Sequence, residues 1–318
     1  MELTNTKQTS EILDELSEYL QYQIPEVLSE TTGYAKFIAF YIDKGGTGKS
    51  THVFNFAGYC ADVLNKRVLI IDGDRSKNIS YTFRVEGECT VSNMFKTFKS
   101  DKPFSVYHTS NKNIDIIPGS STFTDEGVNI NDSKGKYMEF LDFVFYNQDF
   151  FNQNYDFVII DTHNDKSIVT YNLLAACNLV VNVVAPDGNS FTAFEDFPNE
   201  VETILKPMTI PPMSRESATD LDIVVLANNI VMNGVNMTQE TKILIKDLEA
   251  EDNYIGLIPY RKNVGISCLT GENIFQMYEN LPPKQKKSVG LINYLTNVSE
   301  IYNKIITSAC KKAKESQE

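Results

Sequence analysis

The sequence predicts an α/β fold: a single domain built around a mostly parallel, twisted sheet with helices on both faces. Apolar runs of strand length alternate along the chain with segments whose apolar residues recur at helical spacing. A glycine-rich segment, residues 43–51, lies between the first such strand and the first such helix. Two later strands end in aspartate, and carboxylates at strand ends face the ligand crevice of an open α/β sheet.

Composition limits the possible functions. The chain has 318 residues, of which 42% are apolar and 11% aromatic, enough for a substantial core. Its net charge of −13 disfavours a surface that binds polyanions everywhere, so any DNA contact requires a local basic patch. No bilayer-length apolar stretch and no secretory signal pattern is visible, which favours a cytoplasmic protein without membrane contact. The five scattered cysteines are expected to be reduced and structural.

We expect residues 1–34 to form a short N-terminal helical extension ahead of a P-loop domain that spans residues 35–318. Within the extension, the residues that share one helical face are Ile12, Leu16, Tyr19 and Leu20. Pro25 marks a stop or a kink. The apolar face could pack on the protein's own core or contact a dimer partner.

Residues 43–51, Asp-Lys-Gly-Gly-Thr-Gly-Lys-Ser-Thr, have the pattern of a phosphate-binding loop. A strand predicted over 37–42 precedes the loop and a helix predicted over 51–64 follows it, as the motif requires. The glycines allow backbone N–H groups to face phosphate oxygens, and the helix N-terminus adds a favourable dipole. Lys49 is expected to reach the β- and γ-phosphates and Ser50 to ligate Mg²⁺. The predicted nucleotide-binding residues of the loop are Lys44, Gly45, Gly46, Thr47, Gly48, Lys49, Ser50 and Thr51.

Asp43 stands where the usual motif has its first glycine, and Lys44 follows it directly. This Lys-Gly-Gly-Thr-Gly-Lys-Ser-Thr arrangement resembles the deviant Walker A box of the ParA/MinD group of ATPases, and of ParA/Soj-type partition ATPases within it. The resemblance extends over about residues 37–308. It implies a catalytic role for Lys44, which would cross a dimer interface and contact the partner's nucleotide. The alternative is a glycine-rich turn that contains lysines by chance.

A second strand is predicted over 67–72, and it leads into Asp72-Gly73-Asp74. In ParA-like proteins the matching Asp-x-Asp box is followed by Pro-Gln-Gly-Asn, whereas residues 75–77 are Arg-Ser-Lys here. By resemblance, Asp74 is a catalytic residue that positions or activates the attacking water, and Asp72 lies near Mg²⁺. The alternative is that both aspartates cap the next helix.

A third acidic strand end follows the strand predicted over 155–160 and has the form of a Walker B motif. Asp161 is expected to hold Mg²⁺ through a water, since this ion keeps much of its hydration. The family usually continues Asp-Thr-Pro-Pro, but His163 and Asn164 replace the two prolines here. His163 is an alternative proton acceptor, although a loop histidine is more often incidental. The predicted metal ligands are Ser50, Asp72 and Asp161.

The remaining elements are predicted from the same periodicities. Strands are expected over 113–118, 179–186, 222–227 and 254–259, and helices over 136–150, from about Ser190, and over 290–314. The aromatic residues of 136–150 are expected to face the core. Residues 207–217 are expected to form an exposed loop.

The resemblance also places the base of the nucleotide. In this class the strand end that matches residue 227 supplies an amide to the adenine edge, so Asn228 or Asn229 is expected there; a turn role is the alternative. The Ile-Pro of segment 254–261 resembles the family segment that lies along the base. Pro259 is therefore a predicted binding position that acts through its main chain.

The implied function is a cytoplasmic ATPase with ATP and Mg²⁺ as cofactors. It would form a homodimer with ATP, bind DNA non-specifically and so associate with the nucleoid, and respond to a small centromere-binding, ParB-like adaptor that couples it to plasmid or chromosome segregation. Basic groups that could contact DNA, or could be solvated faces, are Arg261 with Lys262, Lys284 with Lys286 and Lys287, and Lys311 with Lys312 and Lys314. The alternatives are a MinD-like positioning ATPase at a membrane surface and a weakly hydrolysing nucleotide switch or DNA-binding autoregulator.

Overall fold

A computed structural model describes residues 34–96, 104–131, 136–205, 221–232 and 237–310. Three predicted features fall outside these ranges: the N-terminal extension apart from Tyr34, the loop at 207–217, and the C-terminal lysines from Lys311 onward. Each of them stays a prediction.

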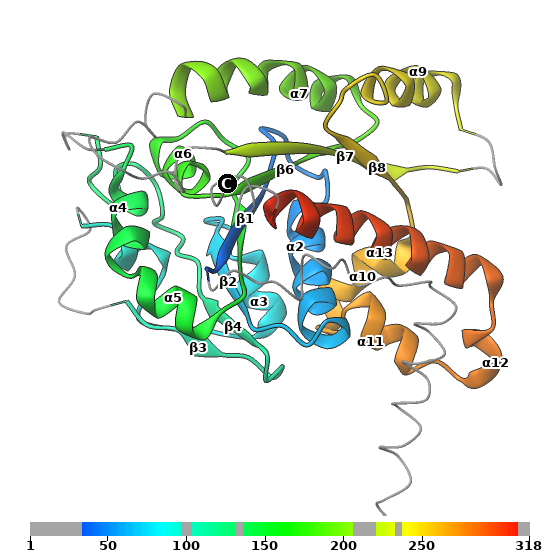
Figure 1. The fold of residues 1–318 in the computed structure, drawn as a ribbon, viewed down its shortest axis with the longest axis horizontal. Coiled ribbons are helices and arrows are strands. Elements are labelled where there is room, and N and C mark those ends of the chain that lie inside the picture. Colours follow the sequence, from blue (N-terminus) through cyan, green and yellow to red (C-terminus); the bar gives the residue numbers. More distant parts are fainter. Residues whose placement is uncertain (1–33, 97–103, 132–135, 206–220, 233–236, 311–318) are drawn as a thin grey trace, which may run out of the picture.

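One sheet organises the described residues, in the strand order β3-β4-β2-β5-β1-β6-β7-β8 (Figure 1). Every neighbouring pair is parallel except β3 and β4 at the edge. The predicted mostly parallel sheet is therefore confirmed. The strands are β1 (Lys36–Tyr41), β2 (Val68–Gly73), β3 (Tyr107–His108), β4 (Ile114–Ile117), β5 (Phe157–Thr162), β6 (Leu179–Val184), β7 (Asp222–Ile230) and β8 (Tyr254–Pro259).

The central strands are buried along their whole length because helices cover both faces of the sheet. Every residue of β2, β5 and β6 is buried, as parallel strands between two helical layers require. The α-helices are α2 (Lys49–Gly58), α3 (Asn78–Phe83), α4 (Glu139–Tyr146), α5 (Gln148–Asn154), α6 (Ile168–Ala175), α7 (Gly188–Glu200), α9 (Gln239–Leu248), α10 (Lys262–Thr270), α11 (Ile274–Glu279), α12 (Pro283–Lys286) and α13 (Val289–Cys310). The described residues also form two short π-helices, η2 (Tyr59–Val63) and η4 (Val201–Leu205), and one 3₁₀-helix, η3 (Val91–Met94).

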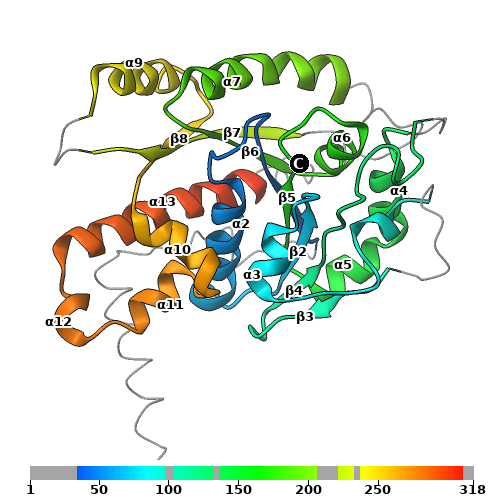
Figure 2. The same ribbon diagram turned by 180° about the vertical axis from the view of Figure 1, so that it is seen from behind.

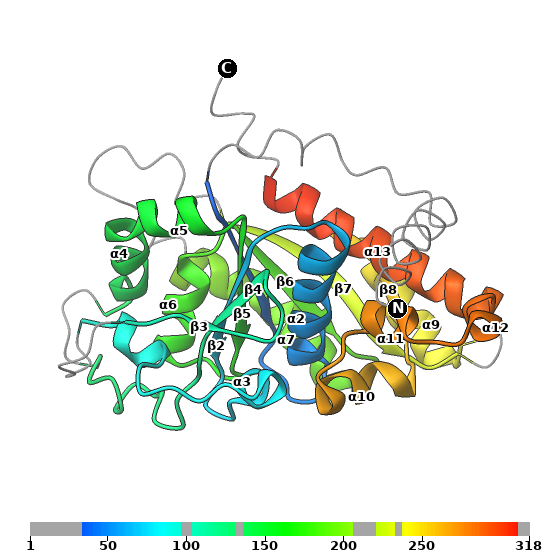
Figure 3. The same ribbon diagram turned by 90° about the horizontal axis from the view of Figure 1, so that it is seen from below.

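The two helical layers build separate cores. Helices α2, α11 and α13 pack on one face, and α4 to α7 pack on the other; α7 and α9 lie together above β6 to β8 when the molecule is turned around (Figure 2). From below, α13 passes obliquely by α2 (Figure 3), and Tyr302 of α13 packs edge-on against Phe56 of α2. The five cysteines form no disulfide, and four of them are buried.

The segment predicted as one helix over 136–150 forms two, α4 and α5. The side-chain amide of Asn147 donates to the carbonyl of Phe143 at 2.8 Å, and such a local bond competes with the helical pattern. The break also changes which aromatics are covered. Phe140 and Phe151 are buried, whereas Phe145 is 40% and Tyr146 81% exposed, so the prediction of core-facing aromatics was wrong for these last two.

His52 links the P-loop helix to α13 in the interior. Its ring lies parallel to Phe40 with the centroids 6.2 Å apart, and its Nδ1 is 3.1 Å from the Tyr302 hydroxyl. Complete burial lowers the pKa of His52 to about 4, because the charged imidazolium would lose its hydration. The folded protein therefore holds this imidazole neutral at physiological pH.

We expect His52 to make folding stability depend on pH. Its folded pKa of about 4 lies below the ordinary value of 6.5, so below pH 6.5 the unfolded chain takes up a proton that the folded chain refuses. Stability present at pH 7.5 is then lost as pH falls, by about 2 kcal/mol at pH 5. In urea unfolding, His52→Gln should be less stable than wild type at pH 7.5, and the difference should narrow by that amount at pH 5. His108→Gln, at an exposed histidine, is the control. If the difference in unfolding free energy between His52→Gln and wild type is the same at pH 7.5 and pH 5, the expectation is contradicted.

Candidate functional site

The loop between β1 and α2 takes a shape that its glycines permit. Gly46 (φ 80°) and Gly48 (φ 98°) have left-handed backbone, which residues with side chains rarely adopt. A Cβ at Gly48 would also collide with the side-chain amide of Asn228. The helix α2 starts at the next residue, Lys49, so its free N-terminal amides border the loop and make it suitable for an anion.

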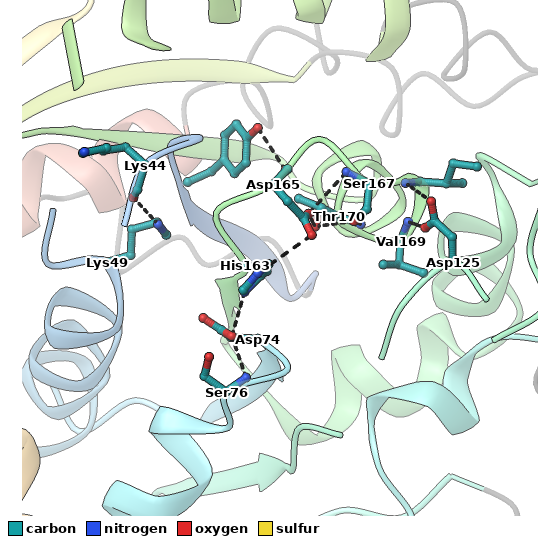
Figure 4. Close-up of polar contacts among 12 residues, drawn as sticks. Lys44, Lys49, Asp74, Ser76, Asp125, His163, Asp165, Ser167, Val169 and Thr170 are labelled. Atoms are coloured by element: carbon teal, nitrogen blue, oxygen red, sulfur yellow. Dashed lines mark hydrogen bonds and ion pairs between the residues drawn. The ribbon is translucent and has the colours of Figure 1, made fainter. Parts of the chain in front are cut away.

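The two lysines of the loop are placed differently. Lys49 is 7% exposed, and its ammonium donates to the carbonyls of Ile42 at 3.2 Å and Lys44 at 2.9 Å. Burial lowers the pKa of Lys49, while the charges of Asp161 and Asp74 act against that shift. The Lys44 side chain points away from that of Lys49 (Figure 4) and makes no hydrogen bond or ion pair within the described ranges.

Two of the predicted aspartates face each other across neighbouring strands. The register of β2 on β5 pairs Asp72 with Asp161, and both side chains are fully buried. Asp72 accepts hydrogen bonds from the Ser80 amide (2.9 Å), the Ser80 hydroxyl (2.6 Å) and the Asp74 amide (3.2 Å). Burial raises the pKa of Asp72 to about 6, although these hydrogen bonds oppose the rise.

Asp161 has the features of a cation ligand. Neither carboxylate oxygen accepts a well-formed hydrogen bond from the described residues. Burial, and then the charge of Asp72, raise the pKa of Asp161 well above its usual range, while the nearby Ser50 hydroxyl lowers it in part. A buried carboxylate without donors is costly unless a cation compensates it. The oxygens of Asp161 and Ser50, with Asp72 beside them, fit Mg²⁺, which takes few protein ligands and keeps its waters.

A cavity of about 460 Å³ opens beside the P-loop, within the size range of cofactor sites. The predicted residues that line it are Gly45, Gly46, Thr47, Gly48, Lys49, Ser50, Thr51, Asp74, Asn228, Asn229 and Pro259. Lys44, Asp72 and Asp161 are not among the lining residues. The two aspartates are buried at the strand ends, and Lys44 lies within the loop, where its backbone carbonyl accepts from Lys49.

Asn228 and Asn229 brace the phosphate-binding loop. The Asn228 amide nitrogen donates to the Thr47 carbonyl at 2.7 Å, and that of Asn229 lies 3.5 Å from the Gly46 carbonyl. Asn229 also has left-handed backbone with φ 58°, within β7 where the pairing with β8 is irregular between Ala227 and Ile230. Contact with adenine therefore stays a prediction for these two residues.

Some wall residues gave no signal in the sequence. Tyr294 reaches the cavity from α13, and its ring lies 4.6 Å from the guanidinium carbon of Arg261. In the sequence Tyr294 belongs to an apolar helical stripe and cannot be told from an ordinary core tyrosine. Tyr260 and Arg261 also line the cavity, and their position directly after β8 was the available signal.

His163 lies closer to the predicted chemistry than its sequence context suggested. Its Nδ1 is 2.8 Å from Oδ1 of Asp74 (Figure 4), and the two side chains are 13% and 10% exposed. The signal was positional, because His163 follows the Walker B strand β5 and Asp74 follows the neighbouring strand β2.

Comparison with known proteins identifies the family. A family model described as an AAA domain matches residues 35–210, which is more than half of the chain. The sporulation initiation inhibitor protein Soj of Bacillus subtilis (strain 168) is 26% identical over 176 residues, covering 54% of this chain and 66% of Soj. The virulence plasmid ParA family protein pGP5-D of Chlamydia psittaci is 26% identical over 171 residues, covering 53% of this chain and 64% of that protein. The matches thus span less than two thirds of these relatives.

Solved structures share the fold at low sequence identity. McdA from Cyanothece, in its apo form, superposes with a TM-score of 0.67 at 15% identity, covering 84% of this chain and 100% of McdA. A plasmid partition protein of Borrelia burgdorferi B31 bound to AMPPNP superposes with a TM-score of 0.61 at 18% identity, covering 85% of this chain and 99% of that protein. The septum site-determining protein MinD of Pyrococcus horikoshii OT3 with Mg-ADP superposes with a TM-score of 0.58 at 17% identity, covering 88% of this chain and 99% of MinD. With a family match over more than half of its length, the chain belongs to the AAA-domain family, and its fold is the P-loop ATPase fold seen in McdA and MinD.

Proposed function

We propose that this protein is a Mg²⁺-dependent ATPase that hydrolyses ATP to ADP and phosphate and uses that cycle to segregate a plasmid or chromosome. The observation that carries the proposal is the cavity at the carboxyl edge of the sheet, where the P-loop amides and Lys49 adjoin the carboxylate of Asp74. Amides and an ammonium suit phosphate oxygens. Asp74 would orient the attacking water, and Mg²⁺ held by Ser50 and Asp161 would neutralise charge on the phosphates.

The wider cycle follows from the family. An ATP-bound homodimer, in which Lys44 reaches the partner's nucleotide, would bind DNA of any sequence, lie on the nucleoid and respond to a small ParB-like adaptor. Support comes from relatives whose names refer to a virulence plasmid ParA family protein and a chromosome-partitioning ATPase. The Lys44 side chain points away from that of Lys49 (Figure 4), which is compatible with a contact in trans.

A MinD-like role at a membrane surface is the alternative. It is supported by the likeness to MinD, with a TM-score of 0.58, while McdA and the Borrelia partition protein reach 0.67 and 0.61. No helix within the described ranges has the length and apolarity to cross a bilayer. We favour segregation because the named sequence relatives include ParA and Soj proteins.

The two P-loop lysines should have separable roles. Lys49→Ala should weaken ATP binding about tenfold or more, since it removes a buried charged donor at the loop. Lys44→Ala should still bind ATP but lose ATP-dependent dimerisation, because the Lys44 side chain makes no hydrogen bond or ion pair within the described part of its own protomer. Isothermal titration and analytical ultracentrifugation with a non-hydrolysable analogue measure the two effects. An unchanged Lys44→Ala dimer would rule out the contact in trans.

Asp74→Ala should bind ATP and fail to turn it over. Positioning the attacking water is needed for phosphoryl transfer but not for gripping phosphates, so turnover should fall about 100-fold or more. The variant should accumulate as the ATP-bound dimer in the ultracentrifuge. Phosphate release at saturating ATP is the measurement, and turnover like that of wild type would remove Asp74 from the chemistry.

The candidate DNA patch lies around α10 and α12. Lys262, Lys284 and Lys287 are exposed, whereas Lys286 pairs with Glu279 at 3.2 Å and has a side chain only 12% exposed. Lys286 is therefore less available to a phosphate than its neighbours. Dimerisation would double the number of exposed lysines that meet one duplex.

We expect the ATP-bound dimer, and not the ADP form, to bind two unrelated duplexes with similar affinity. Fluorescence anisotropy across a salt series should show a steep loss of DNA affinity. The logarithm of the binding constant should fall against the logarithm of the salt concentration with a slope of about −0.9 per phosphate contact. Lys262/Lys284/Lys287→Ala should weaken binding and flatten that slope. Lys242/Lys246→Ala, which removes two lysines from the distant helix α9 (Figure 1), is the control. Absence of DNA binding at low salt with ATP would favour the membrane-surface alternative, which liposome flotation then tests.

A further inference from the structure

The strand register brings His163 and Asp74 together. β2 and β5 pair in parallel through Asp72 with Asp161 and then Gly73 with Thr162. The next residue on each chain is Asp74 and His163, and their side chains meet with Nδ1 2.8 Å from Oδ1. The contact is thus set by two central strands and not by the exposed parts of the loops.

The hydrogen bond has a defined direction. The Asp74 carboxylate can only accept when it is ionised, so Nδ1 of His163 must carry the proton and donate. Oδ1 of Asp74 also accepts from the Ser76 amide at 2.7 Å, while Oδ2 accepts no hydrogen bond from the described residues. Figure 4 shows this second oxygen directed away from His163. One oxygen is therefore anchored and the other is left for a ligand.

Asp165 lies on the far side of the His163 imidazole. The imidazole Nε2 lies 3.9 Å from Oδ2 of Asp165, too far for a direct hydrogen bond. Oδ1 of Asp165 accepts from the Ser167 and Thr170 hydroxyls, both at 2.7 Å, and Ser167 caps α6. Burial raises the pKa of Asp165, but these hydrogen bonds outweigh it and the net shift is downward. A fixed anion thus faces the far side of the imidazole.

The two departures from the family pattern meet at this contact. Arg-Ser-Lys at 75–77 replaces one characteristic segment, and His163 with Asn164 replaces another. Ser76 and His163 both donate to the same oxygen of Asp74, and Asn164 lies against Gly45 of the P-loop. The altered segments therefore contact Asp74 and the P-loop.

We propose that His163 is a positioning residue that holds the Asp74 carboxylate where it can orient the attacking water. It would do so in a chain whose residues 75–77, directly after Asp74, depart from the family pattern. The inference rests on the proposed ATP hydrolysis. Because Nδ1 donates whether the ring is neutral or charged, the proposal does not depend on titration of His163. Misplacing a reacting group by about 1 Å costs about 100-fold in rate, so loss of this anchor should lower turnover while the phosphate contacts remain.

The kinetic test uses two substitutions at one position. His163→Ala should lower kcat about 10- to 100-fold and leave the ATP dissociation constant within about twofold of wild type. His163→Asn keeps an N–H donor where Nδ1 stood and should recover most of kcat. His108→Ala is the matched control, since His108 forms a similar bond to Asp115 at 2.7 Å on an exposed edge strand. Wild-type kcat in His163→Ala, or an Asn variant as slow as Ala, would overturn the proposal.

A second measurement reports the tautomer of His163 and does not depend on ATP turnover. The chain has only three histidines, so ring ¹⁵N spectra of the full-length protein can be assigned with single substitutions. At a pH where the rings are neutral, His163 should carry its proton on Nδ1, and Asp74→Ala should shift it toward Nε2. An Nε2–H tautomer in wild type would refute the anchor even if ATP is hydrolysed. Conversely, the Nδ1–H tautomer in a protein that binds but never hydrolyses ATP would uphold the contact and reject the proposed function.

Discussion

Parallel pairing of β2, β5 and β1 in one register is the constraint on which the site depends. Their carboxyl ends meet at one edge of the sheet, where Asp72 pairs with Asp161 and Phe40 pairs with Asp161 on the other side. The Thr162 hydroxyl donates to the Phe40 carbonyl at 2.6 Å and ties β5 to the strand that enters the P-loop. A slip by one residue would turn these side chains to the opposite face of the sheet.

This arrangement buries carboxyl groups at the strand ends, against an apolar core. Asp72 and Asp161 are fully buried beside Lys49, and only Asp72 has its oxygens satisfied by hydrogen bonds. Such a site is less stable than an apolar one of the same shape. Proteins tolerate this kind of local conflict where function requires it, and the buried strands on both sides supply the rigidity that keeps the charges in place.

The same edge explains why the site contains residues from distant parts of the chain. Asn228 at the end of β7 braces Thr47 in the loop, and Tyr294 of α13 stacks with Arg261 after β8. Each helix returns the chain to the opposite edge, so every parallel strand delivers its carboxyl end to the same side. The resulting cavity is lined on one side by the P-loop and on the other by residues of β7, the end of β8 and α13.

The sequence alone determined the fold class, the P-loop and the acidic strand ends, because these depend on local patterns: buried strands, glycines that permit left-handed backbone, and carboxylates at strand ends. It also located most strands to within one or two residues. It did not reveal the break at Asn147, the exposure of Tyr146 or the wall residue Tyr294, since helical periodicity does not say which face a neighbouring element will cover. The partnership of His163 with Asp74 was decided only in three dimensions: the two residues are far apart in the chain, and only the β2–β5 register brings Nδ1 within 2.8 Å of the carboxylate.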